Sequence, residues 1–227
     1  MAASKDFPGA GPWVPEQPTL GSLHDAVQQC RGCDLYRDAT QAVMGSGRAD
    51  AALMLLGEQP GDREDLAGEP FVGPAGKVLD RALAEAGIEP EDAYVTNAVK
   101  HFRFSGRRGK QRIHKSPSRA QVVACEPWLS AELEVVRPRG MVILGGTAGK
   151  AVYGPGFTVG EQRGRLLDWP VESFAVPRPP AWVLATIHPS AILRSRERDE
   201  MYAGFVADLR VAVDALRRAA GSSREAH

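Results

Sequence analysis

The chain has 227 residues, of which 43% are hydrophobic and 25% are charged, and its formal net charge is zero. These values are typical of one soluble globular domain that buries a sizeable core. No apolar run reaches the length of a membrane span and no secretion signal opens the chain, so we expect a cytoplasmic protein without a membrane partner. Three cysteines cannot all pair, which argues against a disulfide framework.

Composition and periodicity divide the chain into an arm, one domain and a tail. Residues 1–19 are rich in Pro, Gly and Ala and are expected to form a flexible arm, residues 20–218 the domain, and residues 219–227 a frayed tail. Apolar runs predict strands over 51–56, 93–99, 140–145 and 182–187. Helical periodicity predicts helices over 20–30, 76–86, 117–136, 147–152 and 199–217.

The alternation of strands and helices predicts the fold class. We expect an α/β fold, a three-layer αβα sandwich around a central four-stranded parallel sheet. Residues 100–119 are expected to form a loop, and residues 154–180 an irregular segment with a β-excursion. Because the carboxyl ends of parallel strands lie at one edge of the sheet, the segments that follow the strands should gather there.

Polar and aromatic side chains follow these strands. Glu58 comes directly after the first strand, Asn97 lies at the end of the second, and His188 follows the last. A carboxylate, an amide and an imidazole at one edge suit recognition of a planar polar ligand and stabilisation of charge. Phe71 stands among Gly and Pro and is a candidate ring for stacking on that ligand. For each polar residue alone, turn formation is an equal alternative.

The segment 100–119 is strongly basic and contains no Asp or Glu. Phe102 and Phe104 interleave with its cations. This pattern favours a surface that follows a phosphate backbone, and the alternative is an ordinary solvated loop. The cations are Lys100, Arg103, Arg107, Arg108, Lys110, Arg112, Lys115 and Arg119.

The cysteines suggest a metal site. Cys30 and Cys33 form a C-x2-C pair, Cys125 is far downstream, and His101 opens the basic segment. Zinc and iron–sulfur clusters both take four such ligands, so either fits. The alternative is a chance pair with a buried Cys125.

His114 lies in the sequence Arg112-Ile113-His114-Lys115. Flanking cations disfavour protonation, so His114 could act as a neutral nucleophile. On the residues alone, a contact to phosphate is the simpler interpretation.

Together these motifs resemble the uracil-DNA glycosylase superfamily over residues 20–216. The sequence GEQPG at 57–61 is similar to its first motif and HPS at 188–190 to its second, while GEPFVG at 68–73 and YVTN at 94–97 resemble the iron–sulfur branch, family 4. Three differences from family 4, namely Gln59, His101 and the inserted segment with His114, are similar to the UdgX type, which becomes covalently attached to DNA.

The resemblance implies excision of uracil from DNA, with single-stranded DNA favoured; a monomer is the default expectation. Glu58 is expected to stabilise the positive sugar, His188 the leaving base, and His114 to attack C1′. The resemblance further implies uracil stacking on Phe71, an edge contact from Asn97, and other substrate contacts from Gln59, Asp62 and Ser190. It implies phosphate contacts from Arg112 and Lys115, and a [4Fe-4S] cluster on Cys30, Cys33, His101 and Cys125.

Three other functions are open to this sequence. A turnover glycosylase of family 4 would use water in place of His114. A non-enzymatic iron–sulfur or zinc protein would bind DNA without releasing uracil. A nucleotide-binding Rossmann-like domain is disfavoured, because no G-x-G-x-x-G or Walker loop follows the first strand.

Overall fold

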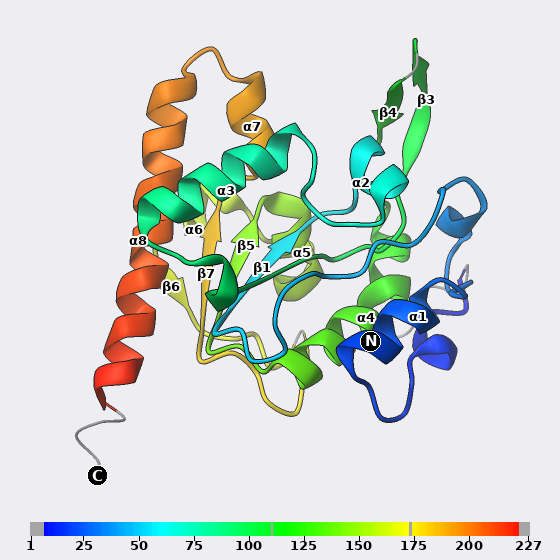
Figure 1. Cartoon of the computed structure of the whole chain (residues 1–227), viewed down its shortest axis with the longest axis horizontal. Coiled ribbons are helices and arrows are strands. Elements are labelled where there is room, and N and C mark those ends of the chain that lie inside the picture. The colour runs from blue at the N-terminus through cyan, green and yellow to red at the C-terminus, as the bar shows by residue number, and fades with distance from the viewer. Residues whose placement is uncertain (1–6, 110, 173, 223–227) are drawn as a thin grey trace.

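The computed structural model describes residues 7–109, 111–172 and 174–222. Its centre is a five-stranded sheet in the order β2-β1-β5-β7-β6 (Figure 1). Four strands run parallel, and the edge strand β6 runs antiparallel to β7. The predicted four-stranded parallel sheet is thus present, with β6 added from the segment where a β-excursion was expected. The strands are β1 (Leu53–Gly57), β2 (Ala93–Asn97), β5 (Gly140–Leu144), β6 (Leu166–Leu167) and β7 (Trp182–Thr186).

Helices cover both faces of this sheet. The main ones are α1 (Leu20–Val27), α2 (Asp62–Ala67), α3 (Pro74–Ala86), α4 (Arg119–Val136), α5 (Gly146–Tyr153), α6 (Val159–Gln162), α7 (Pro189–Arg194) and α8 (Arg198–Ser222). Along β1, Leu53 and Leu55 pack with α3 and α8, whereas Met54 and Leu56 pack with α1 and α4. This alternation on a strand buried on both faces confirms the predicted αβα sandwich.

Local signals set the ends of the helices. Ser118 accepts a hydrogen bond from the Gln121 N–H, and the Gln121 side chain accepts one from the Ser118 N–H, so α4 begins with a capping box. Gly87, at a φ of +82°, ends α3 in the left-handed conformation. None of the helices in the described part of the chain is both long and apolar enough to cross a membrane.

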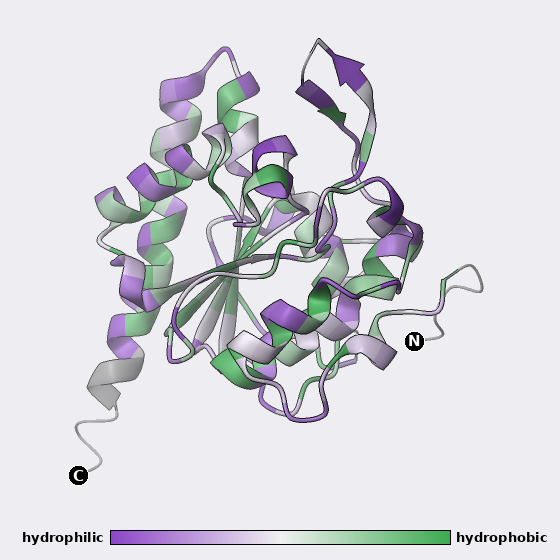
Figure 2. Ribbon diagram, turned by 45° about the vertical axis from the view of Figure 1, so that its right-hand side comes forward, coloured by the Kyte–Doolittle hydropathy of each residue, from purple (hydrophilic) through white to green (hydrophobic). Residues whose placement is uncertain are grey.

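The segment 100–119 forms a hairpin where a loop was expected. Strands β3 (Phe104–Arg108) and β4 (Gln111–His114) pair antiparallel and project from the body (Figure 1). The hairpin is hydrophilic, unlike the central strands (Figure 2). Sequence periodicity missed it because most of its side chains face solvent and a register shift between Phe104 and Arg107 breaks the alternation.

The described part of the segment expected to be a flexible arm packs on the domain. The Ala10 N–H donates to the Ala124 carbonyl at 2.7 Å, and the Gly9 N–H donates to the Gly32 carbonyl at 3.0 Å. Ala10 is buried. At the other end, α8 continues to Ser222, past the predicted domain end, while residues 1–6 and 223–227 lie outside the described residues.

Candidate active site

Asn97 and Phe71 meet at the carboxyl end of β1. Gly57 pairs with Asn97 across β1 and β2. A Cβ atom on Gly57 would lie 2.4 Å from Asn97 Oδ1 and 2.7 Å from Phe71 Cζ. Because no side chain fits there, glycine at position 57 lets the carboxamide and the ring approach the strand end from two sides.

The backbone around Phe71 is held in an unusual conformation. Phe71 has a φ of +58°, a left-handed value that costs energy in a non-glycine residue. The Gly73 N–H after it donates to Glu64 Oε1 at 2.7 Å, and Gly76 lies so close to the Phe71 carbonyl that a Cβ atom would overlap it. These contacts turn the ring toward His188, whose ring centroid is 6.1 Å away.

His188 is a neutral hydrogen-bond donor. It caps α7: its Nδ1 accepts from the Ser190 N–H at 3.1 Å and lies 2.8 Å from Ser190 Oγ, which also accepts from Arg194 Nη1. Burial, together with the charges of Arg194 and His114, lowers the pKa of His188 to about 4. With Nδ1 engaged as an acceptor, the ring proton sits on Nε2, which is free to donate to a ligand.

Glu58 lies next to His114. The distance from His114 Nε2 to Glu58 Oε1 is 3.5 Å, and this oxygen is buried without a hydrogen-bond partner among the described residues. Partial burial lowers the pKa of His114, the Glu58 carboxylate opposes that effect, and Arg194 adds to it. The flanking Arg112 and Lys115, expected from sequence to keep His114 neutral, are not the cause.

Gln59 holds the base of the hairpin. Its Nε2 donates to the carbonyls of Arg103 and Lys115, each at 3.1 Å, and its Oε1 accepts from the Arg103 N–H at 3.0 Å. Gln59 is buried. Its amide therefore joins the two ends of the hairpin that carries His114, and the substrate contact expected of Gln59 stays a prediction.

Arg112 is also a structural residue. It is buried, its Nε lies 2.5 Å from Asp62 Oδ1, and its Nη1 lies 2.7 Å from Asp65 Oδ2. Arg112 and Asp62 are thus paired with each other in this structure, and the phosphate contact expected of Arg112 and the substrate contact expected of Asp62 stay predictions. The sequence alone did not indicate Asp65 as a partner of Arg112. Asp65 is a buried carboxylate that follows the turn at Pro60-Gly61, and Arg112 is distant from it along the chain.

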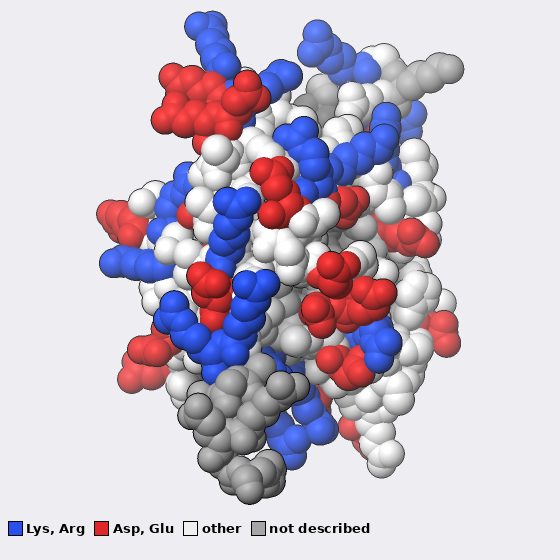
Figure 3. Space-filling model, turned by 60° about the vertical axis from the view of Figure 1, so that its left-hand side comes forward, with Lys and Arg blue, Asp and Glu red and all other residues white. Residues whose placement is uncertain are grey.

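The remaining cations of the segment differ in exposure. Lys100 is fully buried, so it is not part of a phosphate-following surface. Arg107, Arg108 and Lys115 are exposed and remain available to DNA, while Lys110 lies outside the described residues. Over the face that α8 covers, basic and acidic side chains are interspersed (Figure 3). A concentration of positive charge is therefore a property of the hairpin and not of that face.

The candidate metal ligands Cys30, Cys33, His101 and Cys125 are all buried. Backbone N–H groups of Gly32 and Lys100 point at Cys30 Sγ and Cys125 Sγ at 3.4 and 3.3 Å, and Trp128 Nε1 lies 3.3 Å from Cys30 Sγ. Burial lowers the pKa of His101 to about 4 and raises those of Cys33 and Cys125 to about 11 and 12. Among the described residues, no three His, Cys, Asp or Glu side chains are placed to share one metal ion.

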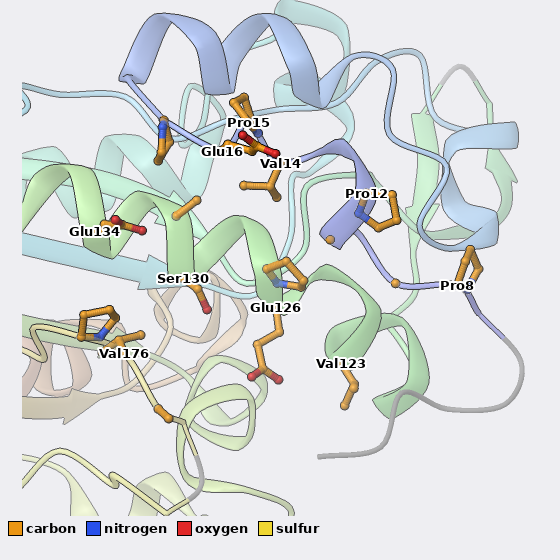
Figure 4. Close-up of a pocket in the computed structure, with 17 residues that line it drawn as sticks. Pro8, Pro12, Val14, Pro15, Glu16, Val123, Glu126, Ser130, Glu134 and Val176 are labelled. Atoms are coloured by element: carbon orange, nitrogen blue, oxygen red, sulfur yellow. The ribbon is translucent and has the colours of Figure 1, made fainter.

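A separate cavity lies away from these residues. It has a volume of about 520 Å³ and runs between the segment 8–18, α4 and residues 175–177 (Figure 4). The described residues that line it are mainly prolines and small side chains, with Glu16, Glu126 and Glu134, and include none of the predicted site residues. This cavity is therefore not the place where the predicted site is built.

The fold and the residues at the carboxyl edge of the sheet define a class of protein. A parallel α/β sheet presents a carboxylate, a carboxamide, an aromatic ring and a neutral imidazole at the carboxyl ends of its strands, an arrangement suited to an enzyme that binds a planar polar group. The sequence profile of the Uracil DNA glycosylase superfamily matches residues 44–210. The chain belongs to this superfamily.

Individual relatives agree with this membership. A "Type-4 uracil-DNA glycosylase" of Thermotoga maritima is 34% identical over 178 residues, which are 78% of this chain and 84% of the relative. One of Archaeoglobus fulgidus is 34% identical over 194 residues, 82% of this chain and 91% of the relative. A "Type-5 uracil-DNA glycosylase" of Pyrobaculum aerophilum is 30% identical over 153 residues, 60% of this chain and 62% of the relative.

Proposed function

We propose that the chain is a uracil-DNA glycosylase that cleaves the bond between uracil and its deoxyribose. One observation carries the proposal: Glu58 Oε1, buried without a hydrogen-bond partner among the described residues, lies at the strand edge where Phe71, Asn97 and His188 also lie. Membership in the superfamily and relatives named type-4 uracil-DNA glycosylase support it.

In this mechanism the base leaves the helix and is read in the site. The Phe71 ring stacks on the uracil plane. The Asn97 carboxamide supplies one donor and one acceptor, which match the O4 and N3–H of uracil. Cytosine presents an amine and an unprotonated nitrogen at those positions, so both contacts are lost when the carboxamide is held in the orientation that matches uracil.

Bond cleavage moves the C1′–N1 electron pair onto uracil. The neutral His188 donates its Nε2–H to the oxygen where negative charge develops, and the Glu58 carboxylate faces the electron-poor sugar. The low pKa of His188 suits this role, because a neutral donor does not have to be deprotonated first.

Two nucleophiles then compete for C1′. Attack by water gives an abasic site and a free enzyme, and the names of the type-4 relatives favour this outcome. Capture by His114 is the second candidate, favoured by the 3.5 Å from its Nε2 to Glu58. In that reaction the Nε2 lone pair forms the bond to C1′, and the Nδ1 proton is released to solvent.

A single experiment tests both the glycosylase activity and the identity of the nucleophile. Uracil-containing single-stranded DNA is incubated with the protein, free uracil is quantified, and the mixture is run on a denaturing gel beside the same strand with thymine. Uracil release supports the glycosylase, and its absence rejects the glycosylase. A shifted band that disappears in His114→Ser, while uracil release persists, supports capture; turnover without a band shows that water is the nucleophile.

The preferred substrate is proposed to be single-stranded DNA, and the active form a monomer. An unpaired base enters the site without the cost of breaking a base pair. Rates on single-stranded and duplex DNA of the same sequence, together with the mass of the protein–DNA complex, test both points.

We propose further that Cys30, Cys33, His101 and Cys125 hold a [4Fe-4S] cluster. The N–H groups directed at Cys30 Sγ and Cys125 Sγ are of the kind that stabilise cluster sulfurs, and the neutral His101 imidazole is ready to act as a ligand. Such a cluster takes ligands spread more widely than those of one metal ion, and it is expected to hold these segments together.

A further inference from the structure

Lys100 is a fully buried cation close to the uracil-reading edge. Its Nζ lies 2.6 Å from Glu132 Oε2 and donates to Thr96 Oγ1 at 2.8 Å and to the Asn97 carbonyl at 2.7 Å. An ammonium group has three N–H donors, so these acceptors satisfy it. The side chain is 0% exposed, so none of its hydrogen bonds reaches solvent.

Glu132 completes a closed network from α4. Its Oε1 accepts from the Tyr94 and Thr96 hydroxyls at 3.0 and 2.8 Å and from the Gly45 N–H at 3.0 Å. Burial raises the pKa of Tyr94, so its hydroxyl remains a donor. The network therefore joins the end of β2 to α4 through groups that water does not reach.

A buried ion pair is a weak source of stability, because the cost of desolvating two charges offsets their attraction. Apolar side chains of the same size would hold β2 and α4 together equally well. The particular effect of Lys100 is that it binds the main-chain carbonyl of Asn97 and so limits movement of the backbone from which the Asn97 carboxamide projects. The Lys100 N–H also bonds Cys125 Sγ, which ties the same residue to the buried cysteines.

We propose that Lys100, paired with Glu132, is a positioning residue for base recognition that holds the backbone carrying the Asn97 carboxamide in place. This inference rests on the proposed function. It predicts that removing both charges leaves a folded protein whose selectivity for uracil is reduced.

The test uses the double variant Lys100→Met with Glu132→Gln, which leaves no unpaired buried charge. The readout is the ratio of dissociation constants for two single strands, one with 2′-fluoro-2′-deoxyuridine, which resists cleavage, and one with deoxycytidine at that position. We expect the ratio to fall about tenfold, the scale of one lost hydrogen bond.

A matched control is the double variant Arg163→Met with Asp208→Asn. This pair is partly buried, with Nη2 to Oδ2 at 2.8 Å, and Asp208 accepts a hydrogen bond from Thr186 at the end of β7. The control is expected to lose thermal stability and keep the wild-type ratio. An unchanged ratio of dissociation constants in the Lys100 and Glu132 variant, or an equal fall in the control, would overturn this inference and leave the proposed function standing. A wild-type protein without preference for uracil would overturn the proposed function and this inference with it.

Discussion

At the scale of single residues, Asn97 is the group that separates uracil from cytosine. Changing Asn97 to Asp replaces the amide donor by an acceptor, so the contact to uracil O4 is lost. We expect single-turnover uracil release to slow by about 5- to 150-fold, equivalent to about 1–3 kcal/mol. Thermal unfolding serves as the control, since a folded variant with wild-type release rates would contradict the assignment of Asn97.

His188 makes stability depend on pH. Its pKa is about 4 in the folded protein against 6.5 for an ordinary imidazole, so between these values the unfolded chain binds a proton that the folded protein does not. Lowering the pH from 6.5 to 4 therefore removes up to about 3 kcal/mol of stability, and above pH 6.5 the contribution is constant.

Urea unfolding at several pH values measures this effect. His188→Gln should flatten the pH dependence in part, because His101 has a similarly lowered pKa and still contributes. If the free energy of unfolding changed with pH equally in the variant and the wild type, this would show that His188 is not buried as a neutral ring. Uracil release should stay insensitive to His188 protonation until the pH approaches 4.

At the scale of elements, the hairpin is the unit that brings His114 to Glu58, and Gln59 closes its base. Gln59→Leu removes three hydrogen bonds to Arg103 and Lys115. We expect amide hydrogens of residues 103–115 to exchange faster and the free energy of unfolding to fall by about 1–3 kcal/mol. Gln111→Ala, at an exposed hairpin position, is the matched control and should change neither quantity.

Arg112 anchors the same hairpin to α2. Arg112→Met leaves the buried Asp65 without its cation, so we expect a loss of about 3–5 kcal/mol in chemical denaturation. Arg107→Met, at an exposed position of β3, should leave the free energy of unfolding unchanged and instead weaken the salt dependence of DNA binding. If Arg112→Met kept full stability and lost only DNA affinity, its phosphate role would be restored.

At the scale of the whole molecule, the buried cysteines and His101 join segments that are far apart in sequence. Protein purified without oxygen should be brown and carry about four irons per chain. Cys125→Ser should lower both the iron content and the melting temperature, whereas His101→Cys should retain the cluster because thiolate is its commoner ligand. Colourless wild-type protein with stoichiometric zinc would contradict the assignment.

Local sequence patterns were enough for the four parallel strands and most helices, and they placed Glu58, Asn97 and His188 at the ends of strands. The apolar run at 51–56 predicts β1 because a parallel strand is buried on both faces. Gly87 and the Ser118 capping box mark helix ends through their own backbone hydrogen bonds. These signals depend on residues within a few positions of each other, so they can be read without the fold.

The tertiary structure alone decided which buried partners the polar residues near the predicted site have. Gln59, Arg112 and Lys100 all lie in or beside predicted site motifs, yet their partners are 44 or 56, 50, and 32 positions away. Whether a cation binds phosphate or a buried carboxylate depends on which side chain folding places beside it and on how much water remains there. The sequence pattern predicts neither the partner of a cation nor its degree of desolvation, because both arise only when elements that are far apart in sequence pack together.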